Sequence, residues 1–185
     1  MVGGFNVWFC ETRRTGLGAK KGELFGLDVL MVGCMLTWTT YGTWLQGDRR
    51  GYVKNAEVLA VNEGLYKANQ QQMKFEPVRL SAKQQSIVMD TILGVAVKSG
   101  QKVFALAVAG NHLHLLVEPA GEPFGCVVSR YKNTVRKAIE ADGFASHLWT
   151  RGFDKRYCNS TEELICRIRY IGRHENSLIF VSEGF

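Results

Sequence analysis

Residues 102–118 of this chain read KVFALAVAGNHLHLLVE, and this stretch decides the fold. Two apolar runs, residues 102–109 and 111–118, lie on either side of a tight turn that begins at Gly110. Apolar runs separated by a short glycine–asparagine turn are typical of a β-hairpin. The stretch therefore predicts two neighbouring antiparallel strands.

The second strand of this hairpin sorts its side chains by face. Because side chains alternate along a strand, His112 and His114 share one face, and Leu113, Leu115 and Val117 share the other. We expect the apolar trio to pack against helices, so the two imidazoles project from the opposite, open face. They lie close enough there to hold one cation. Paired histidines on a solvated strand are also common without any ligand, so the pair alone leaves both interpretations open.

Helix signals surround the hairpin. Residues 81–84 have the spacing of a capping box, and the helix that they open should end at Gly100. A second helix is expected over residues 126–141, and a third runs from a capping box at residues 160–163 to about His174. With a first strand at residues 35–41, this order predicts an α+β fold of the ferredoxin-like split β-α-β type. Such a fold has one antiparallel sheet with helices on one face, and here an additional C-terminal helix.

The last predicted helix carries two polar rings beside its apolar stripe. Leu164, Ile168 and Ile171 recur at helical spacing, and Tyr170 and His174 are four residues apart on one flank of that stripe. This flank is either a half-buried border of the helix or a surface that docks on the open face of the sheet.

Length and composition limit the class of protein. The chain has 185 residues, of which 46% are hydrophobic and 22% charged, as expected of a folded protein with one core. We expect a single domain over residues 31–185, preceded by a loose extension over residues 1–30. No apolar run approaches the ~20 residues that span a bilayer, so no membrane partner is expected. The formal charge of +6 is compatible with a nucleic-acid partner.

Cysteines and glycines exclude two further kinds of site. The five cysteines form no C-x-x-C pair, which favours reduced thiols in a cytoplasmic protein over disulfides or a cysteine–zinc site. The glycine-rich residues 47–51 are not followed by Lys-Ser/Thr, so no nucleotide cofactor is expected.

Four segments in order resemble one known family. They are residues 36–51 (LTWTTYGTWLQGDRRG), 111–118 (NHLHLLVE), 148–153 (LWTRGF) and 169–175 (RYIGRHE). Together they resemble the HUH single-strand DNA transposases, in particular the REP-associated tyrosine transposases, over about residues 35–178. The histidine–leucine–histidine segment corresponds to the HUH motif of that family.

The resemblance implies a chemistry and a set of partners. Tyr170 matches the family's nucleophile, His112 and His114 match its metal ligands, and His174 stands where the family commonly has glutamine or asparagine. The implied cofactor is a divalent cation, Mg²⁺ or Mn²⁺, and imidazole ligands favour Mn²⁺. The implied reaction cleaves single-stranded DNA at hairpin-flanked sites through a 5′-phosphotyrosine and leaves a free 3′-OH. A homodimer is also implied, with active sites that can combine residues from both protomers.

Basic side chains form the candidate DNA contacts, although charged runs are usually only solvated surfaces. The candidates are Arg49, Arg50, Lys132, Arg136, Lys137, Lys155, Arg156 and Arg173. Tyr131, on the helix after the hairpin, is the rival nucleophile.

Two other functions remain open at this stage. One is a catalytically inactive or domesticated nucleic-acid-binding module with the same fold. The other is a zinc hydrolase that uses three imidazoles and water.

Overall fold

The structure is a computed structural model, and it describes residues 31–54, 57–119 and 121–184. The predicted extension over residues 1–30 lies outside these residues. Within the part of the chain that is described, no helix is both long and apolar enough to cross a membrane.

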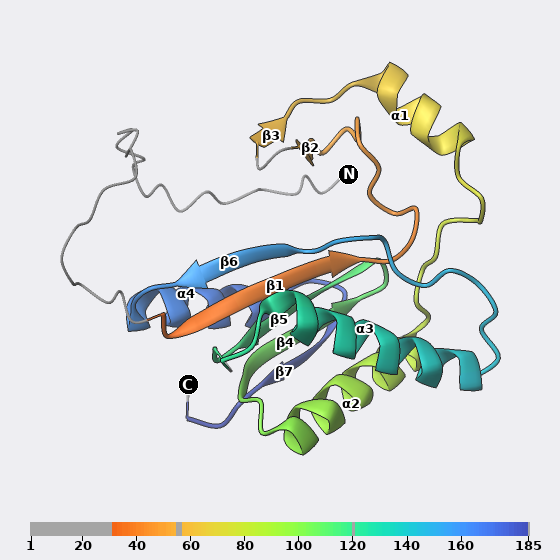
Figure 1. The fold of residues 1–185 in the computed structure, drawn as a ribbon. Coiled ribbons are helices and arrows are strands. Elements are labelled where there is room, and N and C mark those ends of the chain that lie inside the picture. Colours follow the sequence, from red (N-terminus) through yellow and green to blue (C-terminus); the bar gives the residue numbers. More distant parts are fainter. Residues whose placement is uncertain (1–30, 55–56, 120, 185) are drawn as a thin grey trace, which may run out of the picture.

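A five-stranded antiparallel sheet forms the centre of the molecule, in the order β6-β1-β5-β4-β7 (Figure 1). The predicted hairpin is confirmed as β4 and β5, whose residues Leu106 and Leu115 lie opposite each other. The strands are β1 Gly33–Thr39, β4 Val103–Ala109, β5 His112–Val117, β6 Asp154–Cys158 and β7 Ser177–Val181.

Two long helices, α2 (Ala82–Ser99) and α3 (Phe124–Ala141), cover one face of the sheet and enclose the larger part of the core. The predicted capping box of α2 is present, since the Ser81 and Gln84 side chains each accept a hydrogen bond from the other residue's backbone N–H. Gly100 ends this helix in the left-handed conformation, at φ 66°. As predicted, Leu113, Leu115 and Val117 of β5 point into this core.

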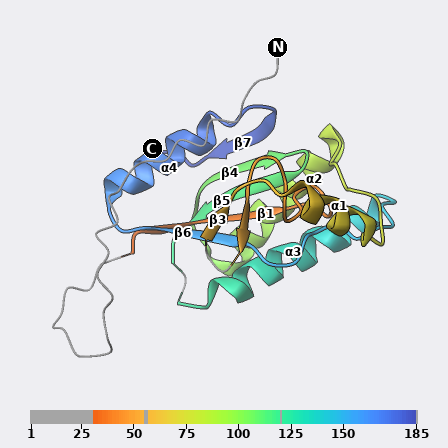
Figure 2. The ribbon, with the colours of Figure 1, turned by 90° about the horizontal axis from the view of Figure 1, so that it is seen from above.

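The fourth helix, α4 (Thr161–Gly172), covers the opposite face of the sheet. Its residues Leu164, Ile168 and Ile171 are buried against a second, smaller cluster that includes Met35 and Leu116. Figure 2 shows α3 and α4 on opposite sides of the strands. The fold is thus α+β, with helices on one face and an additional C-terminal helix on the other.

An excursion between β1 and α2 contains the hairpin β2 (Tyr52–Lys54) and β3 (Glu57–Leu59) and the helix α1 (Glu63–Gln71). It lies apart from the sheet in Figure 1. Gly47 holds α1 in place, since its carbonyl accepts the Asn62 N–H at 3.1 Å. A Cβ at position 47 would stand 2.4 Å from the Asn62 oxygen, so this approach needs glycine.

Several boundaries differ from the prediction. The first strand ends at Thr39 instead of residue 41. The edge strand β6 was not predicted, and it follows residues 148–153, which contain an isolated bridge from Trp149 to Thr40. The last helix ends at Gly172, so His174 lies just beyond it and not within it.

Candidate active site

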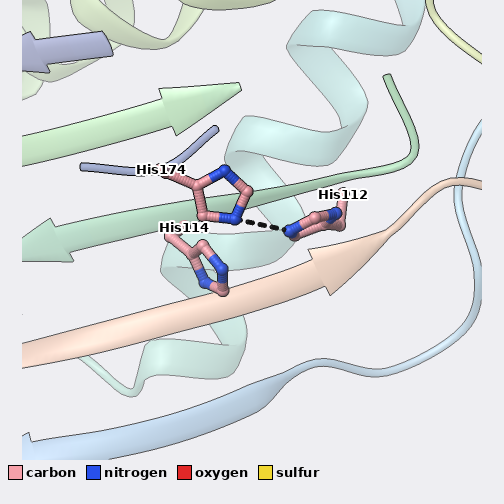
Figure 3. A group of neighbouring side chains, drawn as sticks. All are labelled: His112, His114 and His174. Atoms are coloured by element: carbon pink, nitrogen blue, oxygen red, sulfur yellow. Dashed lines mark hydrogen bonds between the residues drawn. The ribbon is translucent and has the colours of Figure 1, made fainter. Parts of the chain in front are cut away.

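Three histidines meet on the sheet face that α4 covers (Figure 3). His112 and His114 come from β5, and His174 follows the end of α4. One ring nitrogen from each lies within 4.8 Å of the other two. The Nε2 atoms of His112 and His174 are 3.0 Å apart. The structure thus brings together residues that are about 60 positions apart in the chain.

Each histidine of this triad is held through its other ring nitrogen. The Asn111 amide oxygen can only accept, so His112 carries its proton on Nδ1, and its unprotonated Nε2, which here accepts a hydrogen bond from His174 Nε2, has the lone pair that can bind a ligand. Metal-binding histidines generally have such a partner, which fixes both the tautomer and the orientation of the ring. The three Nδ1 contacts are His112 with Asn111 Oδ1 (2.7 Å), His114 with Thr37 Oγ1 (2.8 Å) and His174 with Ser177 Oγ (2.7 Å).

Burial keeps the triad uncharged. Desolvation, with a smaller effect of the neighbouring His174, lowers the pKa of His112 to about 4. The pKa of His114 lies well below its ordinary value because this ring is buried and faces both other histidines. Burial also lowers the pKa of His174. All three rings are therefore neutral at pH 7, and the neutral form is the one that binds a metal ion.

The donor set fits a divalent metal ion. Nitrogens that occupy adjacent positions around one ion, each at ~2.0–2.1 Å, lie roughly 3 Å apart. This matches the 3.0 Å between His112 Nε2 and His174 Nε2. Imidazoles bind first-row transition metals better than they bind Mg²⁺, which prefers oxygen. His112, His114 and His174 could therefore hold a transition-metal ion such as Mn²⁺ or Zn²⁺.

Tyr170 lies beside this triad. Its ring centroid is 5.4 Å from that of His114 and 6.3 Å from that of His174. The side chain is 49% exposed, so its phenol is accessible to a large substrate. Helix α4 positions it, because the buried Ile168 and Ile171 fix the helix against the sheet.

Tyr131, unlike the exposed Tyr170, is buried. It is 1% exposed in the core between α3 and the sheet, on the face away from the histidines. Burial raises the pKa of its phenol to about 12. Both properties disfavour Tyr131 as the nucleophile, because its phenol is out of reach of a substrate in this structure.

Two of the predicted DNA contacts lie near the triad. The positive charge of Arg50 contributes to the lowered pKa of His112, and that of Arg156 contributes to the lowered pKa of His114. The Arg50 guanidinium is anchored by Asp48 at 2.7 Å and donates to the Thr43 carbonyl.

Arg156 reaches the same sheet face from β6. It lies opposite Met35, whose side chain belongs to the cluster under α4. Asp154 pairs with it at 3.0 Å. Both Arg50 and Arg156 therefore add positive charge beside the imidazoles.

Two of the other predicted DNA contacts, Lys132 and Arg136, have partners away from the triad. Lys132 is engaged elsewhere: its ammonium donates to the carbonyls of Thr150 and Gly152 and lies 6.0 Å from the Trp38 ring centroid. Arg136 pairs with Glu140 on α3, the helix that covers the other face. Exposed positions are held by Arg49, Lys137, Lys155 and Arg173.

Sequence reasoning missed the residues that orient the triad. Asn111 directly precedes His112, so the sequence alone could have suggested it as a partner for that ring. Thr37 and Ser177 come close only through strand register, since Thr37 lies opposite His114 and β7 begins at Ser177.

No family model and no curated protein matches this chain. Among solved structures, the chain is similar to a REP-associated tyrosine transposase bound to a REP hairpin, with 14% identity and a TM-score of 0.46, over 82% of this chain and 70% of the other. It is also similar to a proposed transposase from Deinococcus radiodurans R1, with 16% identity and a TM-score of 0.40, over 83% and 96% of the two chains.

Proposed function

We propose that this protein cleaves single-stranded DNA and transfers the cut strand in a metal-dependent reaction, with Tyr170 as the nucleophile. The observation that carries the proposal is the accessible Tyr170 ring beside three converging neutral imidazoles. The resemblance of four sequence segments to the HUH transposases supports the same reaction.

In the proposed step, one bond to phosphorus forms and one breaks. The Tyr170 oxygen attacks a backbone phosphorus and gives up its phenolic proton. The bond from phosphorus to the 3′ oxygen breaks, and that oxygen leaves as a 3′-OH after taking up a proton. The product is a 5′-phosphotyrosine. Because the linkage keeps the bond energy, a 3′-OH can reverse the step and rejoin strands without a nucleotide cofactor.

The neighbouring residues of this chain have separate roles in that step. His112, His114 and His174 would hold the cation, which when bound supplies positive charge to the phosphate oxygens and orients the phosphate. Arg50 and Arg156 attract the DNA backbone to the same face. The helix α4 keeps the Tyr170 phenol next to the imidazoles.

The test is covalent capture of DNA. Protein incubated with Mn²⁺ and single-stranded DNA should give a protein–DNA adduct that resists denaturation and is absent in Tyr170→Phe. Tyr157→Phe is the matched control, because Tyr157 is similarly exposed, at 42%, but lies on β6. An adduct that persists in Tyr170→Phe contradicts the proposal. DNA binding without an adduct in the unmodified protein supports the binding-module alternative.

A second candidate function, zinc-dependent hydrolysis, is favoured by one observation. Three imidazoles are a known ligand set for catalytic zinc, and the triad supplies three. Stoichiometric zinc in the purified protein, together with turnover that Tyr170→Phe leaves intact, would support this function over strand transfer.

The substrate form and oligomeric state implied by the resemblance are part of the proposal. We expect cleavage to favour single-stranded DNA next to a hairpin over the same strand without one. We also expect a homodimer, which light scattering measures directly. The Tyr170 ring lies 5.4 Å from the His114 ring of its own chain, so a monomer that forms the adduct would show that the second protomer is dispensable.

A further inference from the structure

Three aromatic rings from distant parts of the chain form a cluster outside the site described above. They belong to Tyr41 after β1, Phe75 in the segment between α1 and α2, and His147 in the segment between α3 and β6. The Phe75 and His147 rings are nearly parallel, at 14°, with centroids 6.2 Å apart. Tyr41 stands across both, at 73° to Phe75 and 83° to His147.

The backbone of Tyr41 ties the two other segments together. Its N–H donates to the Leu148 carbonyl, and its carbonyl accepts the Val78 N–H, each at 2.9 Å. Its hydroxyl accepts the Lys74 N–H at 3.1 Å. The residues next to Phe75 and His147 are thus fixed to the same point, so the rings are held in place before any ligand arrives.

The cluster is open to solvent on two of its rings. Phe75 is 51% exposed and His147 is also exposed, whereas Tyr41 is partly buried against the core. A flat, half-exposed ring fixed by its neighbours offers a stacking surface, since every nucleobase has a π-face that stacks on such rings. Lys74 adds a positive charge next to Phe75 in the chain.

Hydrogen bonds link the cluster to the triad through two residues. Thr40, which precedes Tyr41, donates its N–H to the Asn111 carbonyl at 2.9 Å. The side chain of Asn111 in turn holds His112. In Figure 1 the segments that carry Phe75 and His147 run past the end of the sheet to which β1 points. Through the end of β1 and Asn111, these rings are therefore tied to the same part of the sheet as the triad.

We propose that the Phe75–His147 pair, supported by Tyr41, binds an unpaired nucleobase of the DNA strand by stacking. This inference rests on the proposed function for its ligand. It assigns a binding role to Phe75 and His147, which the proposed reaction does not use.

The test compares two probes that differ only in their bases. One is a thymidine oligonucleotide of about 16 nucleotides, and the other is an abasic strand of the same length. The protein should bind the thymidine strand roughly 5- to 100-fold more tightly, since stacking is lost in the abasic strand. In Phe75→Ala/His147→Ala this preference should fall several-fold, while affinity for the abasic strand stays unchanged.

Two further variants keep the test decisive. Phe75→Leu keeps an apolar side chain beside Tyr41 but lacks a flat ring, so it should lose the preference even if the double variant folds poorly. Val97→Ala, at an 82% exposed apolar position on α2, should behave as the unmodified protein.

The inference is overturned if the preference for thymidine is absent or is unchanged in all ring variants. This test measures DNA binding, whereas the proposed reaction is tested by the covalent adduct, so the two proposals can fail separately. A ring-dependent preference without any adduct would remove the proposed reaction and keep the stacking site. An adduct without such a preference would support the proposed reaction and overturn the stacking site.

Discussion

The chemistry of the site depends on hydrogen bonds made by the outer nitrogens of the triad. Asn111, Thr37 and Ser177 each hold one Nδ1 atom, which leaves the opposite side of each ring for a ligand. An unheld imidazole would rotate and change tautomer, and its share of the metal affinity would fall. These three residues are therefore positioning residues for the histidines.

Thr37 gives the sharpest test of this role. Thr37→Val keeps the side-chain shape but removes the hydroxyl that accepts the His114 Nδ1–H in the metal-binding tautomer. We expect Mn²⁺ affinity, measured by calorimetric titration, to fall about 10- to 100-fold. Thr37→Ser keeps the hydroxyl and should bind Mn²⁺ nearly as well as the unmodified protein. Equal affinity in the valine and serine variants would show that this hydrogen bond does not matter.

Tyr131 supplies an independent test of the nucleophile. Its buried hydroxyl has no hydrogen-bond partner among the described residues. Removing an unsatisfied buried hydroxyl relieves a desolvation cost. Tyr131→Phe should therefore keep the free energy of unfolding or raise it by about 1 kcal/mol, as measured by urea denaturation. The variant should also form the DNA adduct normally, and loss of the adduct would return Tyr131 to the list of candidates.

At the scale of elements, α4 connects stability to the site. Ser160 caps the start of the helix, since its side chain accepts the Glu163 N–H, and the helix ends two residues before His174. Between these points its buried stripe fixes its distance from the sheet. Tyr170 is thus placed by the packing of residues that never contact the substrate.

Ile168 is the residue of that stripe to test. Ile168→Ala removes buried methyl groups between α4 and the sheet, so the free energy of unfolding should fall by about 2–5 kcal/mol. Thermal or urea unfolding measures the loss. Val97→Ala, at an exposed site on α2, should stay within about 0.5 kcal/mol of the unmodified protein. A similar small change in Ile168→Ala would mean that α4 is not packed as described.

The elements that sequence predicted best are those with strong local signals. Ser81 and Gly100 mark both ends of α2, and the alternation in residues 112–117 places the histidines on one face. The strand β6 has no such signal, because residues 154–157 are all exposed at the edge of the sheet and show no alternation of polarity. The meeting of His174 with β5 depends on how α4 crosses the sheet, and spacing along a helix cannot specify a crossing.

At the scale of the whole molecule, the sheet has unequal cores on its two faces. The face under α2 and α3 carries the larger cluster, and the face under α4 carries the smaller one. The strand β7, at the edge of the sheet, packs beside α4 and exposes Leu178 and Ile179. Units with fewer buried contacts open at lower free energy than the rest of a protein.

Native-state hydrogen exchange tests this difference. Amides of α4 and β7 should exchange at a lower opening free energy than those of α2, β4 and β5, because α4 packs on the smaller cluster and no residue of the edge strand β7 is fully buried. Uniform protection across both groups would show that the molecule opens only as a whole.

The triad combines two histidines from the middle of the sequence with one from near its C-terminal end. His112 and His114 sit on a central strand, while His174 and its partner Ser177 belong to the segment that would loosen first. A metal ion bound by all three rings would stabilise the form in which this segment is packed on the sheet, because only that form brings the three rings together. Metal binding and the docking of His174 beside β5 would then occur together. Local unfolding of the segment that carries His174 would release the metal and stop the reaction while the rest of the protein stayed folded.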